Sequence, residues 1–181
     1  MKHPETYELF PTLVQKHNID PQESIVQDIL DDNDLGDHGI ILGGMRSKSH
    51  KVLENYPKLK QEIQNSINEY AEKLGMDNVI IANSWYNVYF QGGSVRRHNH
   101  PGSIVSGAYY VHLEMPKSHL LIENPNPPEL WNKLTKYNPI VEEIIVQQND
   151  LLLFPSRLYH TTDPNESSRR VCVSFNTNYV E

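Results

Sequence analysis

The chain has 181 residues, of which 38% are hydrophobic and 22% charged, and this composition indicates one folded domain rather than a disordered or fibrous chain. Its 16 Lys and Arg against 23 Asp and Glu give a formal net charge of −7 at pH 7. Proteins that neutralise nucleic-acid phosphates usually carry the opposite sign, so we do not expect nucleic acid as a partner.

The chain contains one cysteine, Cys172, which excludes an internal disulfide and a cysteine-rich zinc site. A single cysteine fits a reducing compartment. The start of the sequence has no apolar signal segment, and no run approaches the roughly 18 consecutive apolar residues of a membrane span. We therefore expect a cytoplasmic protein with no membrane partner.

The first 78 residues mix polar turns with helical patterns. Residues 7–15 could form an edge strand and residues 21–32 a short helix. The clearest helix is predicted over 57–74, with Pro57 in its first turn and Gly75 at its end. Apolar residues recur in it at steps of three and four, at Leu59, Ile63, Ile67, Tyr70 and Leu74. We expect this helix to pack on the outside of a sheet.

From about residue 79 the apolar period changes to two, which is typical of strands. The stretch 79–91 predicts a long strand that ends at Gly92 and Gly93, with Trp85, Asn87 and Tyr89 on one face. Further strands are predicted over 103–114, 118–123, 142–147, 150–156 and 170–177. The sequence therefore indicates a mainly β, α+β single domain over 1–181. It has an N-terminal extension with supporting helices at 1–78 and a sandwich or barrel core at 79–181.

Two histidines lie two residues apart in "RRHNHPGSIVSGAYYVH", residues 96–112. In extended chain, the side chains of His98 and His100 leave the same face, while Asn99 points away. Two imidazoles on one face can converge on one metal ion. The pair alone is a weak signal, because histidines also occur as ordinary surface residues.

His160 and Arg170, which come later in the sequence, strengthen the metal hypothesis. His160 follows the apolar strand and Pro-Ser turn of "NDLLLFPSRLYH", so it can supply the third ligand of a facial triad. Arg170 enters the last predicted strand, which is otherwise apolar. An always-charged guanidinium at such a position suggests an anion to hold, such as a carboxylate. The alternative is a salt bridge to one of the chain's many acids.

Taken together, "SWYNVYFQGG", "HNHP", "SGAYYV", "DLLLFPS" followed by His160, and Arg170 followed by "SFN" resemble a known family. They are similar to the prolyl-hydroxylase-like branch of the 2-oxoglutarate/Fe(II)-dependent oxygenases, and closest to a group of bacterial and phage members. The resemblance covers about residues 80–178. It implies a double-stranded β-helix (a jelly-roll, cupin-like barrel). It also implies a dioxygenase that uses Fe(II), 2-oxoglutarate and O2 to hydroxylate a prime substrate, a small molecule or a protein side chain.

The resemblance also implies roles for the histidines. His98 matches the first iron-binding histidine and His160 the distal one. His100 stands where most of the superfamily has an aspartate. It either completes a three-histidine triad or lies behind the ligands while water fills the position. We favour ligation, because neutral histidine is a competent ligand of divalent iron.

The remaining site residues follow from the same resemblance. Arg170 matches the arginine that grips the distal carboxylate of 2-oxoglutarate, and Arg169 is the alternative if the loop is one residue shorter. Further candidates for the cosubstrate pocket are Tyr110, Asn87, Ser106 and Ser174. For the two serines a purely structural role is the better interpretation.

Two other functions remain open at this point. One is a cupin-type enzyme that uses three histidines and a metal without 2-oxoglutarate, although no glutamate follows the histidine pair as that pattern requires. The other is a β-barrel binding module without catalysis. Residues 123–139, which include Trp131, are long and proline-rich enough to form a lid or an oligomer contact. Exposed sheet edges favour a homodimer.

Overall fold

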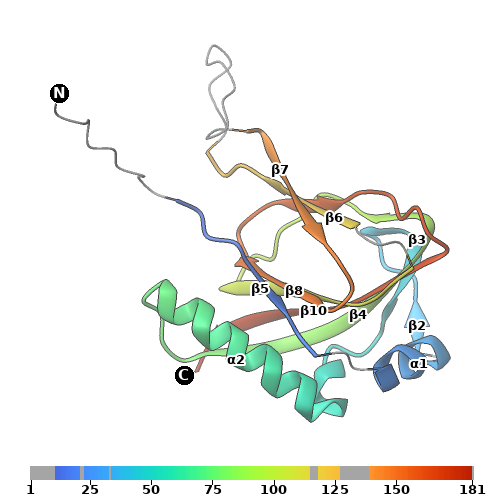
Figure 1. Cartoon of the computed structure of the whole chain (residues 1–181), viewed down its shortest axis with the longest axis horizontal. Coiled ribbons are helices and arrows are strands. Elements are labelled where there is room, and N and C mark those ends of the chain that lie inside the picture. Colours follow the sequence, from blue (N-terminus) through green and yellow to red (C-terminus); the bar gives the residue numbers. More distant parts are fainter. Residues whose placement is uncertain (1–10, 21–22, 33, 115–117, 127–138, 181) are drawn as a thin grey trace.

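The structure of the protein is a computed structural model that describes residues 11–20, 23–32, 34–114, 118–126 and 139–180 (Figure 1). Its helices are α1 (Glu23–Asp31) and α2 (Pro57–Lys73), with a 3-10 turn at Val52–Asn55. Its strands are β1 (Gln15–Asn18), β2 (Leu35–Gly36), β3 (Ile41–Ser47), β4 (Val79–Val95), β5 (Val105–Leu113), β6 (Ser118–Glu123), β7 (Val141–Val146), β8 (Asp150–Pro155), β9 (His160–Thr162) and β10 (Arg169–Tyr179).

The strands form two antiparallel sheets. One has seven strands in the order β1-β8-β5-β10-β4-β3-β2, and the other has three in the order β7-β6-β9. The smaller sheet faces one side of the larger sheet, and α2 lies across the opposite side (Figure 1). This arrangement is the expected double-stranded β-helix with helices packed outside.

Alternation along the strands separates two apolar cores. The core under α2 contains Ile63 and Ile67 of the helix together with Val171 and Val173 of β10. The core between the sheets contains the next residue of the same strand, Cys172, with side chains from β4, β5, β6 and β8. Because neighbouring residues of a strand point to opposite faces, the even-numbered residues of β10 face the space between the sheets.

Helix α2 confirms the prediction from the sequence. Leu59, Ile63, Ile67 and Tyr70 are fully buried, and Gly75 has a φ of 67° just beyond the helix end. Leu74, the last residue of the predicted stripe, is 41% exposed. It occupies the C-cap, at the end of the helix. The predicted helix at 21–32 is also present, as α1.

Strand β4 has the predicted alternation but does not end at the glycines, so that part of the prediction is wrong. It continues through Gly92 and Gly93 to Val95, and its pairing with β3 shifts register between Leu42 and Gly44. A β-carbon at Gly43 would lie 3.1 Å from the Gly93 α-carbon. The glycines therefore let the two backbones approach closely across a bulge rather than ending the strand.

Four strands differ from the sequence prediction. The N-terminal edge strand lies at Gln15–Asn18 and pairs with β8; residues 7–10 of the predicted range lie outside the described residues. Strands β2, β3 and β9 were not predicted. Within the described ranges, no helix is long and apolar enough to cross a membrane. Residues 127–138 of the predicted lid, Trp131 included, also lie outside the described residues.

Candidate metal centre

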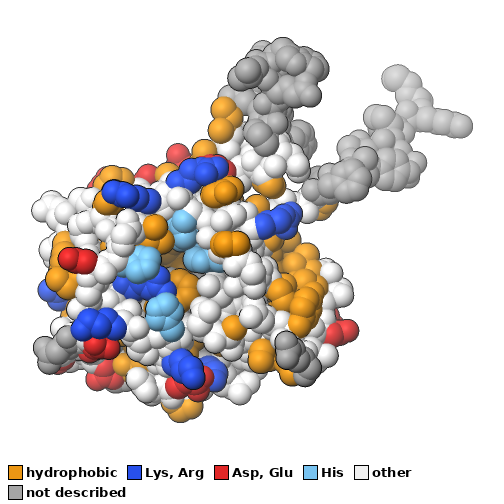
Figure 2. All heavy atoms as spheres, turned by 180° about the vertical axis from the view of Figure 1, so that it is seen from behind, with side chains coloured by type: hydrophobic (Ala, Val, Ile, Leu, Met, Phe, Trp, Pro, Cys, Tyr) orange, Lys and Arg blue, Asp and Glu red, His pale blue; other side chains and the backbone are white. Residues whose placement is uncertain are grey.

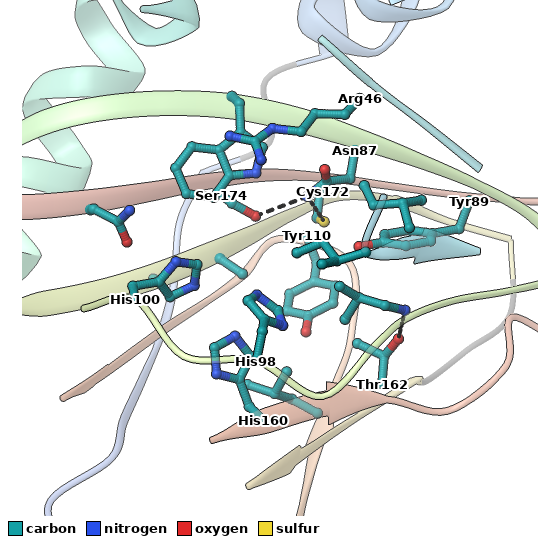
Figure 3. A pocket seen from close by; sticks show the side chains of 18 of the residues that line it. Arg46, Asn87, Tyr89, His98, His100, Tyr110, His160, Thr162, Cys172 and Ser174 are labelled. Atoms are coloured by element: carbon teal, nitrogen blue, oxygen red, sulfur yellow. Dashed lines mark hydrogen bonds between the residues drawn. The ribbon is translucent and has the colours of Figure 1, made fainter. Parts of the chain in front are cut away.

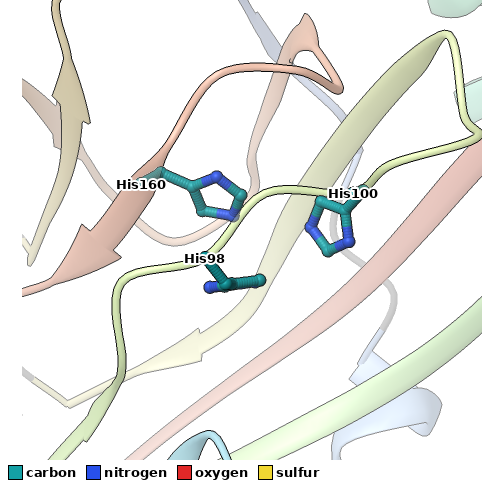
Figure 4. A group of neighbouring side chains, drawn as sticks. All are labelled: His98, His100 and His160. Atoms are coloured by element: carbon teal, nitrogen blue, oxygen red, sulfur yellow. The ribbon is translucent and has the colours of Figure 1, made fainter.

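Three histidines meet at one end of the space between the sheets (Figure 4). His98 and His100 lie on the segment between β4 and β5, and His160 is the first residue of β9. Backbone hydrogen bonds hold the two segments together. The His98 N–H donates to the His160 carbonyl at 3.0 Å, and the His160 N–H donates to the His98 carbonyl at 2.9 Å. The His100 N–H donates to the Ser156 carbonyl at 2.9 Å.

The imidazole nitrogens of the three histidines are arranged for one ion. Each residue offers one ring nitrogen, and these atoms all lie within 4.8 Å of one another. The Nδ1 of His98 lies 2.8 Å from the Arg96 carbonyl, and the Nδ1 of His160 lies 3.0 Å from the Leu158 carbonyl. A carbonyl only accepts, so both Nδ1 atoms carry the proton. The Nε2 lone pairs are therefore available to a metal, which is the usual arrangement of a ligating histidine.

Burial keeps the three imidazoles neutral. Desolvation, followed by the charges of His160, His98 and Arg46, lowers the pKa of His100 to about 3. Desolvation and the charge of His98 lower the pKa of His160 to about 4. The pKa of His98 is also lowered, by burial first and then by Arg46 and His38. Neutral imidazole is the form that binds a metal, so the three residues fit a divalent ion such as Fe(II).

The histidines open into a cavity of about 420 Å³ between the sheets. Figure 2 shows its mouth on one face of the molecule, where histidine side chains gather around a hollow. Val95, Leu120 and Phe154 supply apolar wall near the histidines. The described lining residues include two arginines, Arg46 and Arg170, and no aspartate or glutamate.

Arg170 is 1% exposed, and its bonding differs from that of a structural ion pair. Its Nη1 donates to Ser118 Oγ at 2.7 Å and its Nη2 to Thr162 Oγ1 at 3.0 Å. The guanidinium carbon lies 4.5 Å from the centre of the Tyr89 ring. Among the described residues, no Asp or Glu forms an ion pair with it. The salt bridge considered from the sequence is therefore not found there, and the guanidinium remains able to hold an anion in the cavity.

The other predicted site residues divide into two groups. Tyr110, Asn87 and Ser174 line the cavity with Arg170 and the histidines, and Figure 3 shows Tyr110 between the histidines and Thr162. Ser106 instead bonds to Ser156 and Asn176, each at 2.7 Å, and does not line the cavity. Arg169 precedes Arg170 in β10 and so points to the opposite face of the sheet.

Burial also affects the polar groups beside Arg170. It raises the pKa of Tyr110, so the phenol stays protonated and can donate a hydrogen bond. The Asn87 amide donates to Ser174 Oγ at 3.2 Å, while its own oxygen is buried without a hydrogen-bond partner among the described residues. These groups, from β4, β5 and β10, give the cavity polar contacts beside Arg170.

Arg46 and Thr162 are among the cavity residues that sequence reasoning missed. Arg46 comes from β3, which was not predicted, and its guanidinium carbon lies 4.2 Å from the centre of the Trp85 ring. Thr162 of β9 accepts hydrogen bonds from Arg170 and from the Val95 N–H. A signal for Arg46 was available: like Arg170, it is a charged residue next to a stretch of apolar residues and glycines, "GIILGGM".

Residues 83–176, more than half of the 181-residue chain, match the family described as "Putative 2OG-Fe(II) oxygenase". The chain belongs to this family. It is therefore a 2OG-Fe(II) oxygenase, an oxidoreductase that uses Fe(II) and 2-oxoglutarate, as the sequence resemblance implied. A search of curated protein sequences found no match.

Several solved structures share the fold of this 2OG-Fe(II) oxygenase. HygX from Streptomyces hygroscopicus, with nickel, 2-oxoglutarate and hygromycin B bound, is 10% identical with a TM-score of 0.65, covering 93% of this chain and 84% of its own. A Pseudomonas putida prolyl-4-hydroxylase is 12% identical with a TM-score of 0.61, and the match covers 93% of this chain and 94% of the hydroxylase. A Trichoplax adhaerens prolyl hydroxylase in complex with a hypoxia-inducible-factor peptide is 16% identical with a TM-score of 0.63. The match covers 90% of this chain and 82% of that hydroxylase. At these identities the likeness establishes the double-stranded β-helix.

Proposed function

We propose that His98, His100 and His160 hold Fe(II) in this oxygenase, that Arg170 binds the distal carboxylate of 2-oxoglutarate, and that the enzyme hydroxylates a prime substrate. One observation carries the proposal. A buried arginine without an acidic partner among the described residues lines the same cavity as three neutral histidines. A buried guanidinium is not hydrated, so an anion stabilises its charge. A dicarboxylate can reach from the arginine to a metal at the histidines.

Fe(II) and 2-oxoglutarate, when bound, supply the oxidising power for hydroxylation through decarboxylation of the keto acid and consumption of O2. The chain's own residues place these reactants. Three protein ligands leave up to three coordination positions of the metal ion open. The Nδ1 bonds of His98 and His160 to backbone carbonyls fix the ring orientation, so the ligand set is prepared before a metal arrives.

The polar groups next to Arg170 suit the cosubstrate carboxylate. Thr162 and Ser118 accept from the guanidinium and so fix its plane. Tyr110, protonated because of burial, can donate a hydrogen bond to a carboxylate oxygen. Asn87, with a free amide oxygen, can contact either the cosubstrate or the prime substrate. The apolar wall near the histidines limits access of water to the reacting atoms.

His100 gives this site a charge different from that of a site with one aspartate ligand. Three imidazoles leave the full charge of a divalent ion uncompensated by protein, and this favours dianionic 2-oxoglutarate. The lowered pKa of His100 supports ligation, because the ring stays neutral well below physiological pH. If His100 did not bind the metal, its ring nitrogen would not need to lie close to the ring nitrogens of both His98 and His160, as it does.

The cellular setting is also a proposal. The single cysteine supports a cytoplasmic location, and the net charge of −7 argues against a nucleic-acid substrate. Strand β7 is an edge strand with Val141 40% exposed and Ile145 48% exposed, which supports a homodimer.

The iron site is tested by comparing His160→Ala with His112→Ala, a matched change on β5 outside the cavity lining. Both proteins are reconstituted with Fe(II) under anaerobic conditions, and bound iron and succinate formation from 2-oxoglutarate are measured. We expect His160→Ala to lose iron and succinate formation with its thermal unfolding nearly unchanged, while His112→Ala keeps both. Unchanged iron stoichiometry in His160→Ala would remove His160 from the ligand set.

A further inference from the structure

Arg46 is the second arginine of the cavity, and the roles proposed above do not use it. It lies on β3 directly opposite Asn87 of β4, so both side chains share one face of the sheet. Its guanidinium stacks over the Trp85 ring at 4.2 Å and its Nη1 bonds to His38 Nε2 at 3.0 Å. Figure 3 shows Arg46 on the side of the cavity away from Thr162. Arg46 and Arg170 therefore offer positive charge at two separate places.

Unpartnered polar atoms gather around Arg46. Four side-chain atoms there are buried and lack a hydrogen-bond partner in the described part of the chain: Arg46 Nε, His38 Nδ1, Asn83 Oδ1 and Asn87 Oδ1. Native proteins leave few buried polar groups unpaired, and each such group calls for an explanation. Asn83 and Asn87 lie on the same face of β4 and line the cavity with Arg46. A polar ligand at this end of the cavity would pair the atoms of Arg46, Asn83 and Asn87.

The charge of the cavity favours an anionic ligand. The described lining holds two arginines and no acid, although the protein as a whole has seven more acidic than basic side chains. In the proposed site, the two charges of 2-oxoglutarate offset those of a divalent ion bound by neutral ligands. The positive charges of Arg170 and Arg46 then remain. A cavity of one sign with apolar walls concentrates ions of the other sign.

The free edge of Arg46 defines which anion fits. Nη1 is used by His38, and one face of the guanidinium is covered by Trp85. The edge formed by Nε and Nη2 carries two parallel N–H bonds, which match the two oxygens of a carboxylate. Because Nε is buried, the Arg46 side chain must turn to bring this edge to a ligand in the cavity. The oxygens of Asn83 and Asn87 accept hydrogen bonds, so the same ligand needs an N–H or O–H donor. Terminal amide torsions are broad, so rotation of the amides can turn these oxygens toward a ligand, with Asn87 giving up its bond to Ser174.

We propose that Arg46, Trp85, Asn83 and Asn87 form the subsite of the prime substrate, and that this substrate is a small carboxylic acid with an ammonium or hydroxyl group. The inference rests on the proposed function, which assigns the other end of the cavity to Fe(II) and 2-oxoglutarate. The cavity of about 420 Å³ falls within the roughly 300–1,000 Å³ of sites for small molecules and accommodates a second small acid beside 2-oxoglutarate. In this arrangement Arg46 fixes the carboxylate of the substrate and thereby selects which carbon lies near the metal.

The fluorescence of Trp85 provides a direct readout of this subsite, because the ring lies against Arg46. The chain has two tryptophans, so Trp131→Phe leaves Trp85 as the sole reporter. The protein with Fe(II) and 2-oxoglutarate, kept anaerobic, is titrated with a panel of L-amino acids and 2-hydroxy acids, each paired with its carboxamide. We expect at least one acid to change the emission saturably and its carboxamide to bind at least tenfold more weakly.

Two substitutions of Arg46 and one control complete the test. Arg46→Gln is expected to lose at least tenfold in affinity for the acid, and Arg46→Lys, which keeps the charge without the fork, to lose less. Arg157→Gln makes the same charge change at an exposed residue outside the cavity lining and is expected to bind as the wild type does. Thermal unfolding of each variant checks that the fold is retained.

Three results would overturn the inference: no acid of the panel changes Trp85 emission, the carboxamides bind as well as the acids, or Arg46→Gln weakens 2-oxoglutarate instead. The last result would assign Arg46 to the cosubstrate. Failure of the proposed function is distinguishable, because it appears as an absence of 2-oxoglutarate binding in the wild type. Trp85 emission would still report acid binding to the metal-free protein in that case.

Discussion

Replacing Arg170 with methionine removes a buried positive charge but keeps a long side chain in the space that the guanidinium fills. Arg170 is 1% exposed, donates to Ser118 and Thr162, and forms no ion pair with an acid among the described residues. If it binds the distal carboxylate of 2-oxoglutarate, Arg170→Met removes a charge-assisted hydrogen-bonded pair inside the cavity.

The size of the effect follows from that pair. Hydrogen bonds to charged groups contribute about 1.5–3 kcal/mol. Since about 1.4 kcal/mol is a tenfold change, the dissociation constant of 2-oxoglutarate should rise roughly 10- to 150-fold in Arg170→Met. The substitution also removes the Arg170 donor from the Ser118 and Thr162 hydroxyls, although Thr162 keeps the Val95 N–H, and lowers the free energy of unfolding by about 1–3 kcal/mol. The loss of affinity must therefore be measured well below the unfolding temperature.

The assay is anaerobic calorimetric titration of 2-oxoglutarate into the Fe(II)-loaded protein. Arg169→Met is the matched control, because it removes the same charge one residue earlier, on the opposite face of β10. We expect Arg169→Met to bind 2-oxoglutarate as the wild type does. Unchanged affinity in Arg170→Met, or a comparable loss in Arg169→Met, would refute the assignment of Arg170.

Three further outcomes are expected. His100→Ala should lose bound Fe(II) while His100→Asp keeps one ion per chain; equal iron content in both would show that His100 is not a ligand. In metal-free protein, the pKa of His160 is about 4 when folded against 6.5 when unfolded, so the unfolded chain takes up the proton first as pH falls. Urea titrations should therefore show stability lower by about 2 kcal/mol at pH 5 than at pH 7 from this residue, with His100 adding in the same direction. Stability that is equal or higher at pH 5 would contradict this. Gly44→Ala places a β-carbon against the Val88 carbonyl and 3.2 Å from the Tyr89 α-carbon, so thermal unfolding should reveal a loss of about 1–3 kcal/mol. Gly39→Ala, with open space around it, serves as its control.

Local patterns predicted much of the fold because they reflect local physics. The apolar stripe of α2 is buried as a unit, and its limits follow from Pro57 and Gly75. The alternation of β4 correctly placed Trp85, Asn87 and Tyr89 on one face, and all three line the cavity. His98 and His100 share a face for the same reason, which is why the histidine pair was recognisable from the sequence.

What the sequence did not reveal depends on contacts between distant segments. Strand β3 contains Gly43 and Gly44, which break a strand pattern, yet they are needed because the backbone of β4 passes so close. Arg46 lies opposite Asn87 only through this pairing, and no local spacing encodes it. Strand β9 is three residues long and is defined by its pairing with β6 and by the bridge between His98 and His160.

The most direct test of the account is anaerobic addition of 2-oxoglutarate to the Fe(II)-loaded protein, followed by visible absorption. We predict a weak charge-transfer band that saturates at one 2-oxoglutarate per chain and is missing in His98→Ala. Iron binding without the band would contradict the proposed cosubstrate site and favour a three-histidine metal enzyme that does not bind 2-oxoglutarate in this cavity. Absence of iron binding would contradict the metal centre itself.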